Sequence, residues 1–124
     1  MRNAYKKTLA ATGDPRAVEA ELFSRIGAEL SIAIDNAEDD QPGYVNAVSR
    51  NLQLWTAITA DIVSDGNALP AALRAQLLSL AGFVRRASFD ALSKGVTAET
   101  RTLVEINQNV AGGLRRSLAS GQTP

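Results

Sequence analysis

The stretch NLQLWTAITADIVSDGNALPAAL, residues 51–73, decides the fold of this chain. It carries the only tryptophan, Trp55, on an apolar pattern with helical spacing, which places this side chain in the core. The pattern stops at Gly66, and a new one begins near Pro70. We expect Gly66 to take the positive φ that ends a helix, Asn67 to cap the next helix and Pro70 to lie in its first turn. Two long helices therefore reverse direction at a short joint, and this structural role is enough to explain the joint.

The same spacing of apolar residues recurs through the rest of the chain. It predicts helices over about residues 14–37, 44–63, 70–93 and 97–118. Their ends carry the expected residue types, because Asp and Pro commonly begin helices and Gly commonly ends them. The residues concerned are Asp14 with Pro15 at the first start, Gly95 at the third end and Thr97 as the cap of the last helix.

These elements predict an all-α fold, a single-domain bundle of about four helices. The bundle is expected to span residues 14–118. Residues 1–13 are expected to form an N-terminal arm that is helical in part, and residues 119–124 a flexible polar tail.

The composition excludes most kinds of catalytic and metal site. The 124 residues include no cysteine and no histidine, so thiolate nucleophiles, disulfides and the usual zinc ligands are absent. The acidic run Glu38–Asp40 is not followed by regularly spaced oxygen ligands and is interpreted as a solvated loop. We therefore expect no catalytic residue, no metal and no cofactor, and an enzyme that uses carboxylates alone is the one enzymatic alternative.

Charge, aromatic content and hydropathy argue against two classes of partner, namely nucleic acids and membranes. The net charge is zero and there are only three Phe, two Tyr and one Trp, so base stacking is poorly served and direct nucleic-acid binding is disfavoured. No stretch approaches the roughly 20 apolar residues of a membrane span, and the N-terminal segment lacks the apolar run of a signal peptide. We expect a cytoplasmic protein without membrane insertion.

The third predicted helix is apolar on two sides. One side is long and matches a core stripe: Leu73, Leu77, Leu80, Phe83, Val84, Ala87 and Ala91. The other is shorter: Leu78, Phe89 and Leu92. Such a helix is either enclosed between its neighbours or uses its second side as a groove wall for an amphipathic helix of a partner.

Two further positions stand out from the stripes of their helices. Leu54 falls on the side opposite the core stripe of the second helix, beside Arg50, and is a weaker candidate for a partner contact. Asn107 lies within the apolar stripe of the last helix. A buried amide must find hydrogen-bond partners, so we expect Asn107 to be satisfied inside the core and to define how the helices pack.

The chain resembles the flagellar biosynthesis regulator FlaF family of alphaproteobacteria. The resemblance covers most of the sequence and combines a tryptophan helix, an NALP joint and an INQNV helix. It is carried by Asn51, Leu54 and Trp55, then Asp61, Asn67–Pro70 and Leu73-Arg74, then Leu80, Phe83 and Val84, and finally Leu103–Asn107 with Gly113-Leu114-Arg115.

The resemblance implies a non-enzymatic cytoplasmic protein needed for flagellar filament production. Such a protein is thought to bind flagellin, help its export and act alongside the regulator FlbT. The expected ligand is a terminal amphipathic helix of flagellin, held by Leu78, Phe89 and Leu92 with Arg85, or by Leu54 with Arg50. The alternative is a regulatory adaptor whose partner is FlbT or an RNA-bound complex. The contact would be made by the basic half of the chain, residues 66–124, which holds seven basic and three acidic residues.

Overall fold

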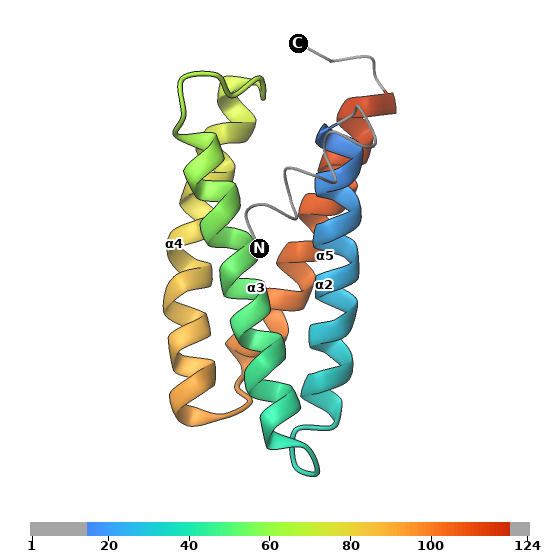
Figure 1. Ribbon diagram of the computed structural model, residues 1–124, viewed down its shortest axis with the longest axis vertical. Coiled ribbons are helices and arrows are strands. Elements are labelled where there is room, and N and C mark those ends of the chain that lie inside the picture. Colours follow the sequence, from blue (N-terminus) through green and yellow to red (C-terminus); the bar gives the residue numbers. More distant parts are fainter. Residues whose placement is uncertain (1–14, 120–124) are drawn as a thin grey trace.

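The computed structural model describes residues 15–119 and contains four helices and no strand within that range (Figure 1). They are α2 (Pro15–Asp35), α3 (Gln41–Ile62), α4 (Ala71–Lys94) and α5 (Ala98–Ala119). The prediction of an all-α bundle of about four helices is confirmed. The predicted arm at residues 1–13, the Asp14 cap and residues 120–124 of the predicted tail lie outside the described residues.

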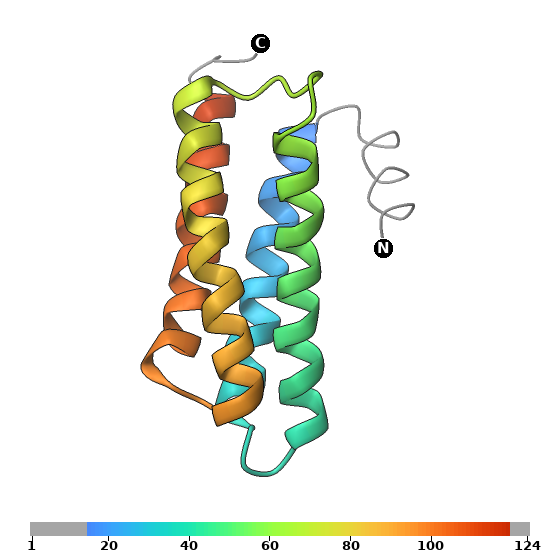
Figure 2. The ribbon, with the colours of Figure 1, turned by 90° about the vertical axis from the view of Figure 1, so that its left-hand side faces the viewer.

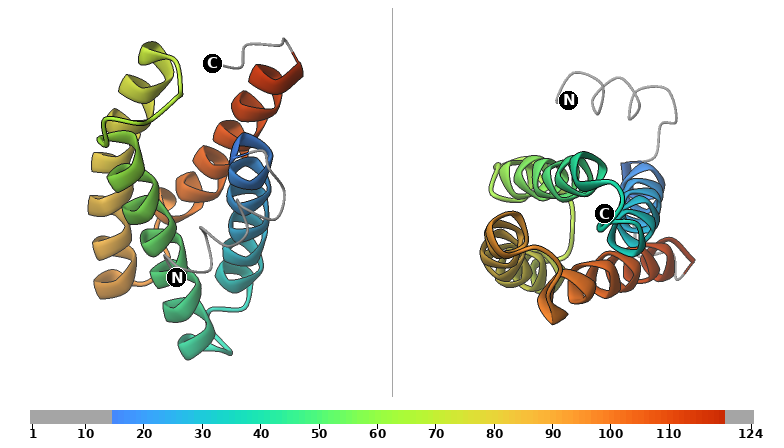
Figure 3. Two further views of the ribbon diagram at one scale, coloured as in Figure 1. Left: turned by 45° about the horizontal axis from the view of Figure 1, so that its top comes forward. Right: turned by 90° about the horizontal axis from the view of Figure 1, so that it is seen from below.

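The helices run alternately up and down and occupy the four corners of a bundle (Figure 3). Helix α5 packs most extensively on α2 and much less on α4. The end of α4 and the start of α5 lie close together, and the two helices then diverge toward the start of α4 (Figures 1 and 3). Helix α4 therefore packs along α3 and has a smaller contact with α5, which lies behind it in Figure 2.

Three helix ends show why these segments begin and end where they do. Asp40 caps α3, since its Oδ1 accepts a hydrogen bond from the Gly43 N–H at 3.0 Å. Gly95 ends α4 with φ 83°, a conformation that favours glycine. At the start of α5 the Thr97 N–H donates to Thr100 Oγ1 at 3.0 Å, and the Thr100 N–H donates to Thr97 Oγ1 at 3.3 Å. The predicted roles of Gly95 and Thr97 are confirmed.

The joint between α3 and α4 differs from the prediction. Gly66 does not take a positive φ, and the Asn67 side chain does not cap α4. Instead, Asn67 Nδ2 donates to Asp61 Oδ2 at 2.9 Å, and its Oδ1 accepts from the Leu69 N–H at 3.0 Å. Pro70 lies directly before α4 rather than inside its first turn. The connection is long enough to reverse without a left-handed residue, and the Asn67 amide holds it back against α3.

Trp55 belongs to the core, as predicted. It is 2% exposed, and its ring meets Phe23 of α2 edge-to-face with centroids 5.2 Å apart. Leu54 is also in the core, 1% exposed, so the prediction that it faces outward is wrong. The reason is that α3 lies between α2 and α4, and contact on both sides buries a wider arc of its surface than a single apolar stripe.

A chain of polar side chains joins α3 to α5 inside this core. Trp55 Nε1 donates to Asn107 Oδ1 at 3.0 Å, and Asn107 Nδ2 donates to Asn51 Oδ1 at 2.7 Å. Asn51 and Asn107 are both fully buried. The prediction that Asn107 is a satisfied buried amide is confirmed.

Close packing of α2 on α5 depends on a glycine. A Cβ built on Gly27 would lie 2.9 Å from Gln108 Nε2 and 3.1 Å from Asn107 Cβ. Gln108 Nε2 also donates to the Ser24 carbonyl of α2 at 3.3 Å. Because Gly27 has no side chain, α2 can approach α5 closely beside the buried Asn107.

Candidate functional site

Three of the predicted partner residues line one groove between α3 and α4. Leu78 is 40% exposed, Phe89 is 51% exposed, and Arg85 lies between them along the helix. The groove has a volume of about 580 Å³. We call it the α3–α4 groove, and its lining consists of Leu52, Trp55, Thr56, Thr59, Ala60, Leu78, Ala81, Gly82, Arg85 and Phe89.

The two walls of the α3–α4 groove are mainly apolar. On α4, residues 78, 82, 85 and 89 follow one another at helical spacing, and the Arg85 guanidinium lies 5.5 Å from the centre of the Phe89 ring. On α3, Thr56 and Thr59 use their hydroxyls to donate to backbone carbonyls of their own helix at 2.8 and 2.7 Å. None of the lining residues is acidic. The groove therefore presents an apolar surface with one cation.

The other predicted partner residues lie elsewhere. Leu92 is half-buried and packs against the core rather than lining the groove. Arg50 forms an ion pair with Glu29 of α2, with Nη1 and Oε1 3.0 Å apart. Leu54 is a core residue. The structure thus brings Leu78, Arg85 and Phe89 together and separates them from the alternative pair of Arg50 and Leu54.

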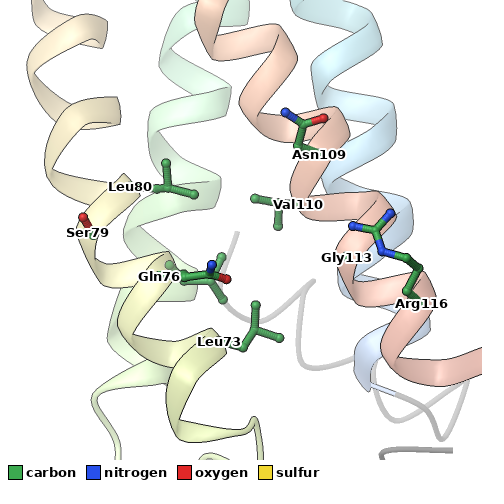
Figure 4. Close-up of a pocket in the computed structure, with 9 residues that line it drawn as sticks. Leu73, Gln76, Ser79, Leu80, Asn109, Val110, Gly113 and Arg116 are labelled. Atoms are coloured by element: carbon green, nitrogen blue, oxygen red, sulfur yellow. The ribbon is translucent and has the colours of Figure 1, made fainter. Parts of the chain in front are cut away.

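A second groove, between α4 and α5, was not predicted from the sequence. It consists of two adjoining hollows of about 410 and 380 Å³ that share Leu73, Gln76, Gly113 and Arg116. Figure 4 shows Leu73 and Leu80 of α4 on one side of the gap and Val110 of α5 on the other. We call this surface the α4–α5 groove, and its remaining lining is Pro70, Ala72, Leu77, Ser79, Asn109 and Ser117.

One sequence signal points to this second groove. Gly112 and Gly113 lie inside α5, where each glycine costs about 1 kcal/mol relative to alanine. By contrast, the leucines of the α4 wall have core spacing, so nothing in their pattern distinguishes a core position from a groove wall. The two adjacent glycines are the one feature of this groove whose sequence indicates close approach of another chain segment.

Both grooves are suited to hold an apolar surface. Each contains one arginine and no carboxylate. Within residues 15–119, no group of three or more acidic, histidine or cysteine side chains is placed to hold a metal ion. None of the helices in that range combines the length and the apolar character needed to cross a bilayer.

Comparison with known proteins places the chain in a family. No curated protein and no solved structure matches it. A family model described as flagellar protein FlaF matches residues 1–114, which include α2, α3, α4 and most of α5. The match agrees with the resemblance carried by the Trp55 helix, the joint before α4 and the Asn107 helix. The chain is therefore a member of the FlaF family of flagellar proteins.

Proposed function

We propose that this FlaF-family protein is a non-enzymatic, cytoplasmic flagellin-binding protein that acts as an export chaperone and regulator needed for filament assembly. The family match supports a flagellar role. The observation that carries the finer proposal is the α3–α4 groove, in which Leu78 and Phe89 stay exposed on a helix whose other side is buried in the core.

The proposed ligand is a terminal amphipathic helix of flagellin. Before assembly, the apolar stripe of such a helix has no partner, and an exposed stripe of this kind promotes aggregation. A groove between two neighbouring antiparallel helices, with apolar walls, would cover such a stripe. Arg85 at the wall is available to an acidic residue on the ligand, because within the described residues it makes a contact with the Phe89 ring and no ion pair.

The test is binding of purified flagellin to Leu78→Asp and Phe89→Asp variants. We expect each to weaken binding by about tenfold or more, because a carboxylate would be buried against the apolar stripe of the ligand. Ile32→Asp and Val63→Asp are matched controls, since these side chains are 63% and 65% exposed and lie outside both grooves. Unchanged binding by both groove variants, with the fold intact by circular dichroism, contradicts this site.

The alternative function is a regulatory adaptor that acts through FlbT on flagellin expression. It is favoured by four exposed cations on α4 and α5, namely Arg85, Arg86, Arg115 and Arg116. A salt titration separates the two functions. Affinity for FlbT or for an RNA-bound complex through these cations falls steeply with salt, whereas affinity for an apolar helix changes little.

A further inference from the structure

A Cβ on either of the two adjacent glycines of α5 would meet only the end of the Arg116 side chain within the described residues. A Cβ built on Gly113 would meet nothing nearer than Arg116 Nη2 at 3.8 Å, and one on Gly112 would lie 3.4 Å from Arg116 Nη1. Gly27 is the contrasting case, because its Cβ would lie 2.9 Å from Gln108 Nε2. Packing within the chain therefore explains glycine at position 27 and does not explain it at 112 and 113.

The surface around Gly113 has the shape and polarity of a helix-binding groove. Leu73 and Leu80 of α4 are half-buried and face Val110 of α5 across the gap (Figure 4). Leu77, which is 2% exposed, lies at the floor of the α4–α5 groove. Helices α4 and α5 diverge toward this end of the bundle (Figure 1). Because Gly113 has no side chain and its neighbour is the movable end of Arg116, a second helix could approach α5 closely here, as at other helix crossings with small residues.

The charge at this groove is uncompensated. Arg116 lies beside the two glycines and makes none of the three ion pairs found among residues 15–119. Its neighbour Arg115 is exposed as well. No acidic residue lines the groove, and residues 66–124 hold seven basic against three acidic residues. An occupant with a carboxylate near Arg116 would be favoured over a neutral or basic one.

We propose that the α4–α5 groove is a second docking site, which takes an amphipathic α-helix with a small residue against Gly113 and a carboxylate against Arg116. The proposal rests on the proposed function, since the helix is assigned to the same flagellin chain that occupies the α3–α4 groove. Residues of helix α4 line both grooves. A client bound on both sides of α4 gains affinity because its second contact forms within the complex.

The experiment compares substitutions at positions 113 and 116 in the full chain. Gly113→Leu fills the space above the helix, and Arg116→Glu reverses the charge. Each is expected to weaken binding of purified flagellin monomer by about tenfold, measured by calorimetry. Gly113→Ala is the matched control, because its Cβ meets only ordinary contacts, and it should bind as the wild type does. Circular dichroism and thermal unfolding of each variant verify the fold.

A photo-cross-linking residue at Gln76, on the rim of the same groove, provides an independent readout. The cross-linked flagellin peptide should contain an acidic residue within two helical turns of the attachment point. Full binding by both Gly113→Leu and Arg116→Glu overturns the second site and leaves the proposed function standing. A wild-type chain that forms no complex with flagellin overturns the proposed function itself. A cross-linked peptide without an acidic residue overturns the assignment of the carboxylate.

Discussion

The indole N–H of Trp55 on α3 donates a hydrogen bond of 3.0 Å to Asn107 Oδ1 on α5, two residues separated by 52 positions in the chain. The bond lies in the core. Asn107 also donates a second hydrogen bond from its Nδ2, 2.7 Å long, to Asn51 Oδ1. This connection ties α3 to α5 across the bundle.

Substitution of Asn107 by leucine should destabilise the protein by about 2–4 kcal/mol, because Trp55 Nε1 and Asn51 Oδ1 would both lose their partner while remaining buried. Urea unfolding followed by circular dichroism measures the loss. Asn109→Ala, at an exposed position of the same helix, should change the stability by less than about 0.5 kcal/mol. Equal effects of the two substitutions would mean that the buried polar chain contributes nothing specific.

Ser88→Ala should leave the protein as stable or make it more stable by about 1 kcal/mol. Ser88 is fully buried on α4, and its hydroxyl oxygen has no hydrogen-bond partner within the described residues. Removing an unpaired buried hydroxyl removes its desolvation penalty. Ser79→Ala, exposed on the same helix, corrects for the better helix propensity of alanine. The difference between the changes in thermal midpoint of the two variants measures the effect of the buried hydroxyl. A lower midpoint for Ser88→Ala than for Ser79→Ala would contradict the prediction.

Gly27→Val and Gly82→Ala should change stability in opposite directions. At Gly27 the added side chain would collide with Asn107 and Gln108, so we expect a loss of about 1–3 kcal/mol from overpacking of α2 against α5. At Gly82 a Cβ would meet only Arg86 Nη1, at 3.7 Å, so alanine should stabilise α4 by about 0.5–1 kcal/mol. Chemical denaturation of the two variants beside the wild type gives both values. A stable Gly27→Val protein would show that α2 and α5 do not need their close approach.

Gly82→Leu should block flagellin binding at the α3–α4 groove without unfolding the protein. The leucine would project from the α4 wall, between Leu78 and Phe89, into the space of the groove. Gly82→Ala is again the matched control, since one methyl group leaves most of the groove open. Trp55 is the only tryptophan and forms part of the groove lining, so its fluorescence reports both folding and ligand entry. A fluorescence change on adding flagellin to wild type that persists in Gly82→Leu would exclude ligand entry at this groove.

Part of the α4 wall of the α3–α4 groove could be predicted from the sequence, but its α3 wall could not. Leu78 and Phe89 fall on a second apolar side of their helix, and helical spacing alone is enough to separate them from the core stripe. The prediction for Leu54 was wrong, because a single stripe of apolar residues predicts only one buried side for each helix. Helix α3 has neighbours on two sides, and its buried arc includes a position that the pattern places outside.

The α4–α5 groove lies beyond what a pattern along the chain can predict. Leu73, Leu77 and Leu80 have core spacing, yet two of them remain half-buried because α5 diverges from α4 at that end. How far two helices diverge depends on side chains at their crossing point, which are distant in sequence. The diglycine in α5 was visible in the sequence, but the space beside it was not.

The sequence by itself determined the helices, the burial of Trp55 and the need for a partner at Asn107, because these follow from local spacing and from the cost of burying an unpaired amide. Only the tertiary structure decided which side chains satisfy Asn107, how Asn67 holds the joint and where two grooves open along α4. Those features depend on distances between helices, and the distances are set by packing contacts that no single segment contains.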